Sequence, residues 1–250
     1  MDIWEACKDS LTPTLLDDTM LRLVESQTQI ATSELVDTLE EQSLLETLLE
    51  QTKPAIPFNS EKLHFLLATP FRYPPLPWGS RFGTRMEPGI FYGSLETRTL
   101  LAEAAYYRFI FWYDMAQAPE EGKLLTQHHS IGVAYHTVNG IQLQEAPCNF
   151  YQTYLTHPSD YSATQALGAK LRAQNIDAVT YISARDPEAG VNVALFKPAA
   201  LACSQPLFQH LWLSDTRASA ITFYSHQAEH VYRFELEQFL YQGTLPKPAL

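Results

Sequence analysis

Segments typical of strands and of helices follow one another over the last two thirds of the chain without regular alternation. Runs rich in β-branched and aromatic residues predict strands at 89–93, 178–182, 191–196, 207–213 and 220–224. Apolar residues spaced three and four apart predict helices at 95–113, 161–174 and 231–241. Strands that alternate regularly with helices form parallel sheets, so this irregular order favours an α+β fold with a mostly antiparallel sheet.

A further pair of strands is predicted within residues 127–144. An Asn-Gly step divides this stretch, and Asn-Gly is the sequence most strongly associated with a tight turn between antiparallel strands. We therefore expect a hairpin here, with Val138, Asn139 and Gly140 at its turn.

The first 52 residues differ from the rest of the chain in charge. They contain twelve acidic and two basic residues and so carry −10 of the net charge of −11. Apolar residues recur at steps of three and four over residues 14–51, which predicts helices, the second of them capped by Thr32 or Ser33. We expect this acidic helical segment, residues 1–55, either to pack on the main domain as a helical hairpin or to form an arm that binds a basic partner or a second copy.

Two groups of prolines separate this segment from the predicted sheet. Pro54 and Pro57 end the helical pattern, and three more prolines predict an extended path over 71–77. The glycine-containing stretch at 79–89 predicts a structured loop. The main domain is accordingly taken as residues 56–250.

Several classes of protein are disfavoured by the composition. The first residues have no basic region followed by an apolar run, and no apolar stretch is long enough to span a membrane. Outside the N-terminal segment the charges nearly balance, without the basic stripe of a nucleic-acid binder. Cys7, Cys148 and Cys203 are scattered and form no metal-binding motif. We therefore expect a cytoplasmic protein with no metal, no disulfide scaffold, no membrane segment and no direct contact with nucleic acid.

The first stretch that could carry chemistry surrounds Arg81. The Gly-Ser-Arg-Phe-Gly-Thr-Arg run at 79–85 combines small residues with two guanidinium groups, which suits close contact with a phosphate. Arg81 and Arg85 are the candidates, and Arg72 is a third. An ordinary surface turn would have the same composition, so this run alone does not decide between the two.

The second candidate group is Tyr92 with Glu103. Tyr92 lies in a predicted strand near its end, and Glu103 lies in the middle of the helix that follows. Glu103 shares a helix face with Leu100 and Tyr107, which indicates that this face points inward. A carboxylate on an inward face is costly unless it is paired or used in chemistry, so Glu103 is either a catalytic group or the partner of a structural arginine.

The third candidate group lies around the loop between the strands predicted at 178–182 and 191–196. Ser183 ends the first of these strands, Arg185 follows two residues later, and Asn192 enters the second. We expect these side chains to converge on the rim of one pocket. Ser183 has no Gly-x-Ser-x-Gly context, so it is not the nucleophile of a serine hydrolase of that kind.

Taken in order, these stretches resemble the RES domain, a family named for an arginine, a glutamate and a serine in such surroundings. The resemblance covers about residues 65–200, and compact members have Arg-Trp-Asn where this chain has Arg-Phe-Gly. The matching residues are Arg81 in the run at 79–83, Tyr92 after Gly-Ile-Phe, Glu103 after Leu-Ala, Ser183 in the run at 176–185, Gly-Val-Asn at 190–192 and Leu-Phe at 195–196.

The resemblance implies a fold similar to that of ADP-ribosyltransferases, with a β-rich core, flanking helices and a cleft that binds NAD. Members are toxins of toxin–antitoxin pairs that break the bond between nicotinamide and ribose by hydrolysis or phosphorolysis, and the usual antitoxin is an Xre-type protein. The implied substrates are NAD and, for phosphorolysis, inorganic phosphate. A protein ADP-ribosyltransferase and a non-catalytic NAD-binding module are the alternatives, and a homodimer is left open.

The resemblance also implies a role for each candidate residue. Glu103 would stabilise the positive charge that develops on the ribose, and Arg81 would bind the pyrophosphate or an incoming phosphate. Tyr92 would contact the nicotinamide ribose, and Ser183 the nicotinamide end or an oxyanion. Further residues expected to bind NAD are Arg85, Arg185 and Asn192.

Overall fold

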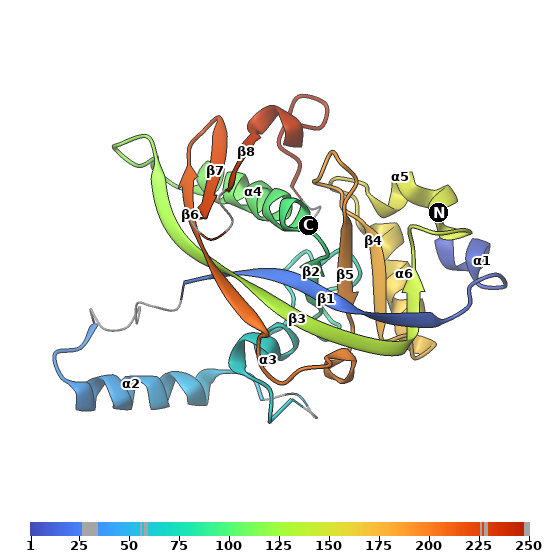
Figure 1. Cartoon of the computed structure of the whole chain (residues 1–250), viewed down its shortest axis with the longest axis horizontal. Helices are drawn as coiled ribbons and strands as arrows, with labels where there is room; N and C mark the ends of the chain where they lie inside the picture. Colours follow the sequence, from blue (N-terminus) through green and yellow to red (C-terminus); the bar gives the residue numbers. More distant parts are fainter. Residues whose placement is uncertain (27–34, 56, 58–59, 226, 228–229, 248–250) are drawn as a thin grey trace.

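The protein is built around one sheet of eight strands in the order β1-β2-β5-β4-β3-β6-β7-β8, in which β1 also pairs with β3 (Figure 1). The computed structural model describes residues 1–26, 35–55, 57, 60–225, 227 and 230–247. Only β3 and β4 are parallel among the described strand pairs, so the predicted α+β class with a mostly antiparallel sheet is confirmed. The strands are β1 Thr14–Glu25, β2 Phe91–Ser94, β3 Leu124–Gln142, β4 Ala178–Ile182, β5 Val191–Leu195, β6 Phe208–Thr216, β7 Ala220–Ser225 and β8 His230–Glu235.

The described part of the chain also contains six α-helices. They are α1 Ile3–Cys7, α2 Leu39–Thr52, α3 Phe65–Arg72, α4 Thr97–Asp114, α5 Gln152–Leu155 and α6 Ser162–Ala173. The helices predicted at 95–113 and 161–174 are confirmed as α4 and α6. The five short strands predicted between 89 and 224 are confirmed as β2, β4, β5, β6 and β7. None of the described helices is both long and apolar enough to cross a membrane.

Five of the strands pair in a closed circuit, because β1 joins β2 on one side and β3 on the other. Their apolar side chains form one buried cluster that includes Met20, Phe91, Ile131 and Val193. A second cluster joins α4 to the sheet extension of β6, β7 and β8, and a third lies between α6, α1 and the strands β4 and β5. The β-rich core with flanking helices is therefore confirmed.

Residues 14–25 form strand β1, so the helix predicted there is wrong. β1 pairs antiparallel with β3 along nearly its whole length, and the side chains of its own Leu16 and Met20 are buried. Apolar residues at 16, 20 and 24 fit a helix, but they also lie on one face of a strand, and pairing with the distant β3 decides between the two. Because α1 and β1 contribute to the buried core, the boundary predicted at residue 55 does not separate two cores, and the predicted helical hairpin is excluded.

The hairpin predicted within 127–144 is also wrong, because these residues belong largely to the single long strand β3. The pairing of β1 with β3 shifts register here, since Thr14 lies opposite Gly140 while Leu16 lies opposite Thr137. A β-carbon on Gly140 would lie only 2.3 Å from Cγ of Leu16, so the glycine makes room for β1. The Asn-Gly signal thus marks an irregularity inside a continuous strand.

The last predicted helix, 231–241, is wrong as well. His230–Glu235 form β8, and Leu236–Phe239 form a short 3-10 turn. β7 offers β8 a pairing partner along its full length, and Phe234 and Phe239 are both buried in the cluster next to α4. Pairing and burial together favour the strand over the helix.

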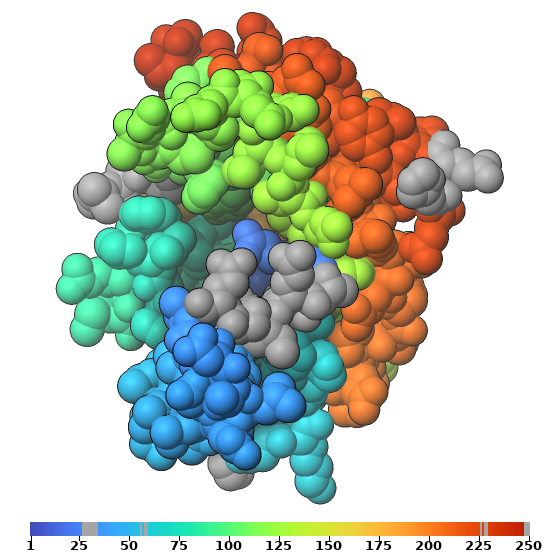
Figure 2. Space-filling model, turned by 90° about the vertical axis from the view of Figure 1, so that its left-hand side faces the viewer, coloured from blue at the N-terminus to red at the C-terminus, as the bar shows by residue number. Residues whose placement is uncertain are grey.

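Helix α2 is the confirmed part of the predicted N-terminal helices. Thr38 and Glu41 form a capping box at its start, and the helix ends at Thr52, two residues before Pro54. Thr32 and Ser33, the predicted caps, lie outside the described residues. None of the residues of α2 is buried, and Figure 2 shows this helix lying on the surface. Its expected role as a partner-binding or dimerising arm stays a prediction.

The end of α2 is joined to α3 by an ion pair. Nη1 of Arg72 lies 2.7 Å from a carboxylate oxygen of Glu50. The extended path predicted for 71–77 begins at Tyr73, because α3 continues to Arg72. Arg72 is therefore engaged in this ion pair and does not line the cavity described below.

A buried polar network joins α4 to the sheet. His128 on β3 is 5% exposed, and its Nε2 lies 3.0 Å from Nη1 of Arg108 and 2.8 Å from Oγ1 of Thr126. Nε of Arg108 also donates to Oγ1 of Thr216 at 2.5 Å. Because arginine can only donate, Nε2 of His128 acts as an acceptor and carries no proton. Burial, and then the Arg108 cation, lower the pKa of His128 to about 4.

We expect this histidine to make the protein less stable in mild acid. The unfolded chain binds a proton at His128 below its ordinary pKa of 6.5, whereas the folded protein resists protonation down to about 4. The free energy of unfolding therefore falls as the pH drops from about 6.5 to about 4, by up to about 3 kcal/mol. Urea unfolding of wild type and His128→Gln at pH 7.5 and 4.5 measures this. The wild type should lose more stability than the variant, and equal losses would refute the assignment.

Candidate active site

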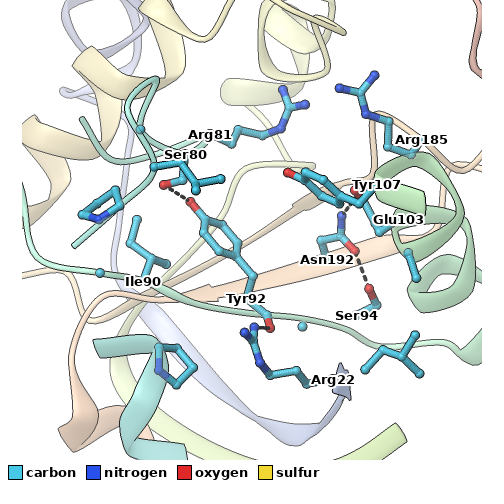
Figure 3. Close-up of a pocket in the computed structure, with 18 of the residues that line it drawn as sticks. Arg22, Ser80, Arg81, Ile90, Tyr92, Ser94, Glu103, Tyr107, Arg185 and Asn192 are labelled. Carbon is cyan, nitrogen blue, oxygen red and sulfur yellow. Dashed lines mark hydrogen bonds between the residues drawn. The ribbon is translucent and has the colours of Figure 1, made fainter. Parts of the chain in front are cut away.

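A cavity of about 590 Å³ lies between the short strands β2 and β5, the first half of α4 and the proline-rich stretch before Gly79. Ser183 does not line the cavity itself but donates a hydrogen bond to Glu103, which does. Arg85 is exposed and does not line the cavity. The three stretches singled out in the sequence thus meet at one place (Figure 3). Five of the predicted site residues line this cavity: Arg81, Tyr92, Glu103, Arg185 and Asn192.

Glu103 is held by neutral donors rather than by a cation. Its Oε1 accepts hydrogen bonds from Oγ of Ser183 and from Nδ2 of Asn192, each at 2.6 Å. Oδ1 of Asn192 accepts a hydrogen bond from Oγ of Ser94, also at 2.6 Å, which fixes the orientation of the amide. No ion pair in the described part of the chain includes Glu103, so the alternative of a structural arginine partner is wrong.

Ser183 is enclosed by its own hydrogen bonds. It is 4% exposed, and its Oγ accepts from the backbone amides of Arg185 and Asp186 at 3.0 and 3.1 Å while donating to Glu103. A hydroxyl has one proton, and here Glu103 receives it. The geometry therefore suits Ser183 to orienting Glu103 rather than to touching a molecule in the cavity.

Arg81 and Arg185 are both buried, and no carboxylate partners either guanidinium among the described ion pairs. Nη1 of Arg81 donates to the carbonyl groups of Leu155 and His157 at 2.9 and 3.1 Å. Nη2 of Arg185 donates to the carbonyl of Pro158 at 2.5 Å. Figure 3 shows the two guanidinium groups close to one another at one end of the site. They form an uncompensated positive end that suits an anion with several oxygen atoms.

Aromatic rings support both guanidinium groups. Arg81 lies over the ring of Tyr161, with Cζ 4.6 Å from the ring centroid. Arg185 lies over the ring of Tyr106 at 3.6 Å, and its Nη2 is 3.3 Å from the Tyr161 hydroxyl. Carbonyl groups and ring faces stabilise a cation without cancelling its charge. Tyr161 was not among the residues predicted from the sequence, because nothing in its local pattern distinguishes it from a core tyrosine.

Tyr92 connects β2 to the loop that carries Arg81. Its hydroxyl donates to Oγ of Ser80 at 2.9 Å and accepts from the backbone amide of Phe82 at 3.2 Å. Burial raises the pKa of Tyr92 to about 12, so the phenol stays protonated at neutral pH. Its ring lines the cavity while its hydroxyl fixes residues 80–82.

Arg22 is a further cation of the cavity, and it was not predicted from the sequence. It lies on β1, its Nη1 donates to the carbonyl oxygen of Tyr92 at 2.8 Å, and its guanidinium lies over the ring of Phe91. Burial lowers the pKa of Arg22 to about 10, so it is still charged at neutral pH. Figure 3 shows it on the side of the site opposite Arg81 and Arg185. Reading residues 14–25 as a strand would have placed Arg22 on the same face as Met20.

The arrangement has a clear charge pattern. One carboxylate, Glu103, lies between a pair of arginines at one end of the site and Arg22 at the other. Such a site can bind anionic groups at two places and stabilise positive charge between them. Among the described residues, no three His, Cys, Asp or Glu side chains are grouped closely enough to hold a metal ion.

Comparison with known proteins identifies the family. The model of the RES domain matches residues 56–216, which is well over half of the chain. Among solved structures, the chain is similar to the crystal structure of the MbcT–MbcA toxin–antitoxin complex of M. tuberculosis, with 12% identity, a TM-score of 0.45 and coverage of 86% of this chain and 92% of that one. No curated protein sequence matches the chain significantly. The chain belongs to the RES domain family.

Proposed function

We propose that this protein is an enzyme that cleaves NAD between nicotinamide and ribose and acts as the toxin of a toxin–antitoxin pair. The observation that supports this most directly is Glu103, a carboxylate without a cation partner that lines a cavity with three arginines. The family resemblance supplies the substrate, and the charge pattern of the cavity agrees with it. NAD has an anionic pyrophosphate and a positively charged nicotinamide ring.

The chemistry needs little more than charge stabilisation. Departure of nicotinamide as a neutral base leaves positive charge on the ribose carbon, as in glycoside cleavage. Glu103 would stabilise that charge through the oxygen that faces away from Ser183 and Asn192. Arg81 and Arg185 would bind the pyrophosphate, and the ring of Tyr92 would pack against the nicotinamide ribose. Ser183 would orient Glu103 instead of contacting nicotinamide, which revises the role first expected from the sequence.

We propose inorganic phosphate as the acceptor that attacks the ribose. Arg22 has no carboxylate partner among the described ion pairs and lies across the site from the arginine pair, so a second anion could be bound there. Attack by a phosphate oxygen joins it to the ribose carbon and gives ADP-ribose 1-phosphate and nicotinamide. Attack by water gives ADP-ribose, nicotinamide and a proton. A protein side chain as acceptor would make the enzyme an ADP-ribosyltransferase.

The proposed partner is an antitoxin of the Xre type, which rests on the family resemblance alone. In the M. tuberculosis structure, the toxin MbcT is in a complex with the antitoxin MbcA. The acidic surface helix α2 is a separate candidate for contact with a basic protein, since nine-tenths of the net charge of the chain lies in the segment that contains it.

Replacing Glu103 tests the central assignment. Glu103→Gln should lower the rate of nicotinamide release about 100- to 1000-fold while NAD still binds, because the amide keeps the shape but not the charge. Chromatography of nicotinamide measures the rate, and calorimetry measures NAD binding. Glu96→Gln is the matched control, because it removes the same charge from the N-cap of the same helix, outside the cavity. A fully active Glu103→Gln variant would exclude the mechanism.

The acceptor can be identified from phosphate dependence. Wild-type turnover should rise with inorganic phosphate, and Arg22→Gln should raise the KM for phosphate about 10- to 100-fold, the effect of one charge-assisted contact. Mass spectrometry distinguishes ADP-ribose 1-phosphate from ADP-ribose. Arg85→Gln, an exposed arginine outside the cavity, is the control. Turnover that does not respond to phosphate would exclude phosphate as the acceptor, and release of free ADP-ribose would then identify water.

A further inference from the structure

The loop between β4 and β5 is joined to α4 by two buried hydrogen bonds one helical turn apart, beside a more exposed ion pair in which Nε of Arg98 lies 3.0 Å from Glu188. In the first, Oγ of Ser183 donates to Glu103 at 2.6 Å. In the second, Oγ1 of Thr99 donates to Oδ2 of Asp186 at 2.8 Å. Thr99 and Glu103 are four residues apart and so lie on the same face of α4. The two bonds therefore align loop and helix along that face.

The second of these bonds is completely enclosed. The side chain of Asp186 has no exposed surface, and Thr99 is 0% exposed. Oδ1 of Asp186 accepts from the backbone amide of Glu188 at 3.1 Å and lies 3.6 Å from Nε of Arg98. A buried carboxylate is costly unless its acceptor positions are satisfied. The position of the loop residue Asp186 against α4 is therefore strongly determined.

Gly190 closes the loop against the same point. Its carbonyl oxygen accepts a hydrogen bond from the amide of Ser183 at 2.8 Å. A β-carbon at this position would lie 1.8 Å from Oγ1 of Thr99 and 2.8 Å from Oδ2 of Asp186. Loop and helix thus touch without room for a methyl group, and only glycine fits.

The contact between the loop and α4 determines how two groups of the cavity, Glu103 and Arg185, lie relative to one another. Asp186 and Arg185 both donate their backbone amides to Oγ of Ser183, which in turn donates to Glu103. The guanidinium of Arg185 extends from the same loop into the site. A shift of the loop along α4 would move Ser183 and Arg185 relative to Glu103 together.

We propose that Thr99 and Asp186, neither of which lines the cavity, are positioning residues of the reaction, and that their hydrogen bond sets the distance between Glu103 and Arg185. This inference rests on the proposed function for its effect on turnover, but not for its effect on the loop. A hydrogen bond that only stabilised the fold would change the amount of folded protein, not the kinetics of the molecules that are folded.

The test compares Thr99→Val, which removes the hydroxyl, with Thr99→Ser, which keeps it. In Thr99→Val we expect kcat for NAD cleavage to fall about 10- to 100-fold, since misplacement of catalytic groups is costly. Thr99→Ser should restore most of the activity. Thr137→Val is the matched control, because Thr137 is also buried and donates to an aspartate, Asp177, at 2.9 Å, outside the cavity. This control should lose stability but keep its kcat.

Hydrogen exchange provides a readout that needs no substrate. In Thr99→Val the amides of Arg185 and Asp186 should exchange faster, while amides of β3 keep their protection. Unchanged exchange at these amides, or a kcat equal to that of the wild type, would overturn the proposal. If the wild type itself does not cleave NAD, the proposed function fails. The exchange result still decides whether the hydrogen bond between Thr99 and Asp186 holds the loop in place. Should Thr99→Val not fold, Asp186→Asn is measured in the same way.

Discussion

The pair of hydrogen bonds to Oε1 of Glu103 is the interaction on which the site depends. A carboxylate on the inner face of a helix has to be stabilised, and here neutral donors do so without cancelling its charge. The donors reach it because of the sheet. β4 ends at Ile182, directly opposite Val191, the first residue of β5. Ser183 and Asn192 therefore lie at the same end of this pair of strands. Ser94 lies opposite Asn192 on β2 and fixes the amide from the other side.

The arginines of the cavity are likewise stabilised by neutral groups rather than by groups of opposite charge. Arg81 and Arg185 are held by backbone carbonyl groups and aromatic rings, and Arg22 by a carbonyl group and a ring, so none of the three is paired with a carboxylate among the described ion pairs. Had Arg81 paired with Glu103, each would have neutralised the other. The fold instead keeps opposite charges apart within one cavity. In a protein of net charge −11, this is a local concentration of positive charge next to one isolated carboxylate.

What could be predicted from the sequence was mostly local. The short strands β2, β4 and β5 and helix α4 have clear periods and clear ends, and they bring Tyr92, Glu103 and Asn192 together. The long strands β1 and β3 were misread because their stability comes from pairing with each other across the sequence, as at Leu21 and Gly132. The role of Ser183 could not be derived from its neighbours in sequence, because it depends on a hydrogen bond to a helix residue 80 positions away.

Strand β1, which was misread as a helix, also contributes to the site. The family model begins at residue 56, whereas Arg22 lies on β1 and still lines the cavity. The matched residues therefore do not contain the whole site. β1 pairs with both β2 and β3, so the strand that completes the circuit of the sheet is also the one that brings the third cation to the cavity. Removing the first 25 residues would thus remove a strand and a cation together, and loss of activity in such a truncation would not separate the two. A single substitution at Arg22 leaves the backbone pairing of β1 intact and isolates the charge.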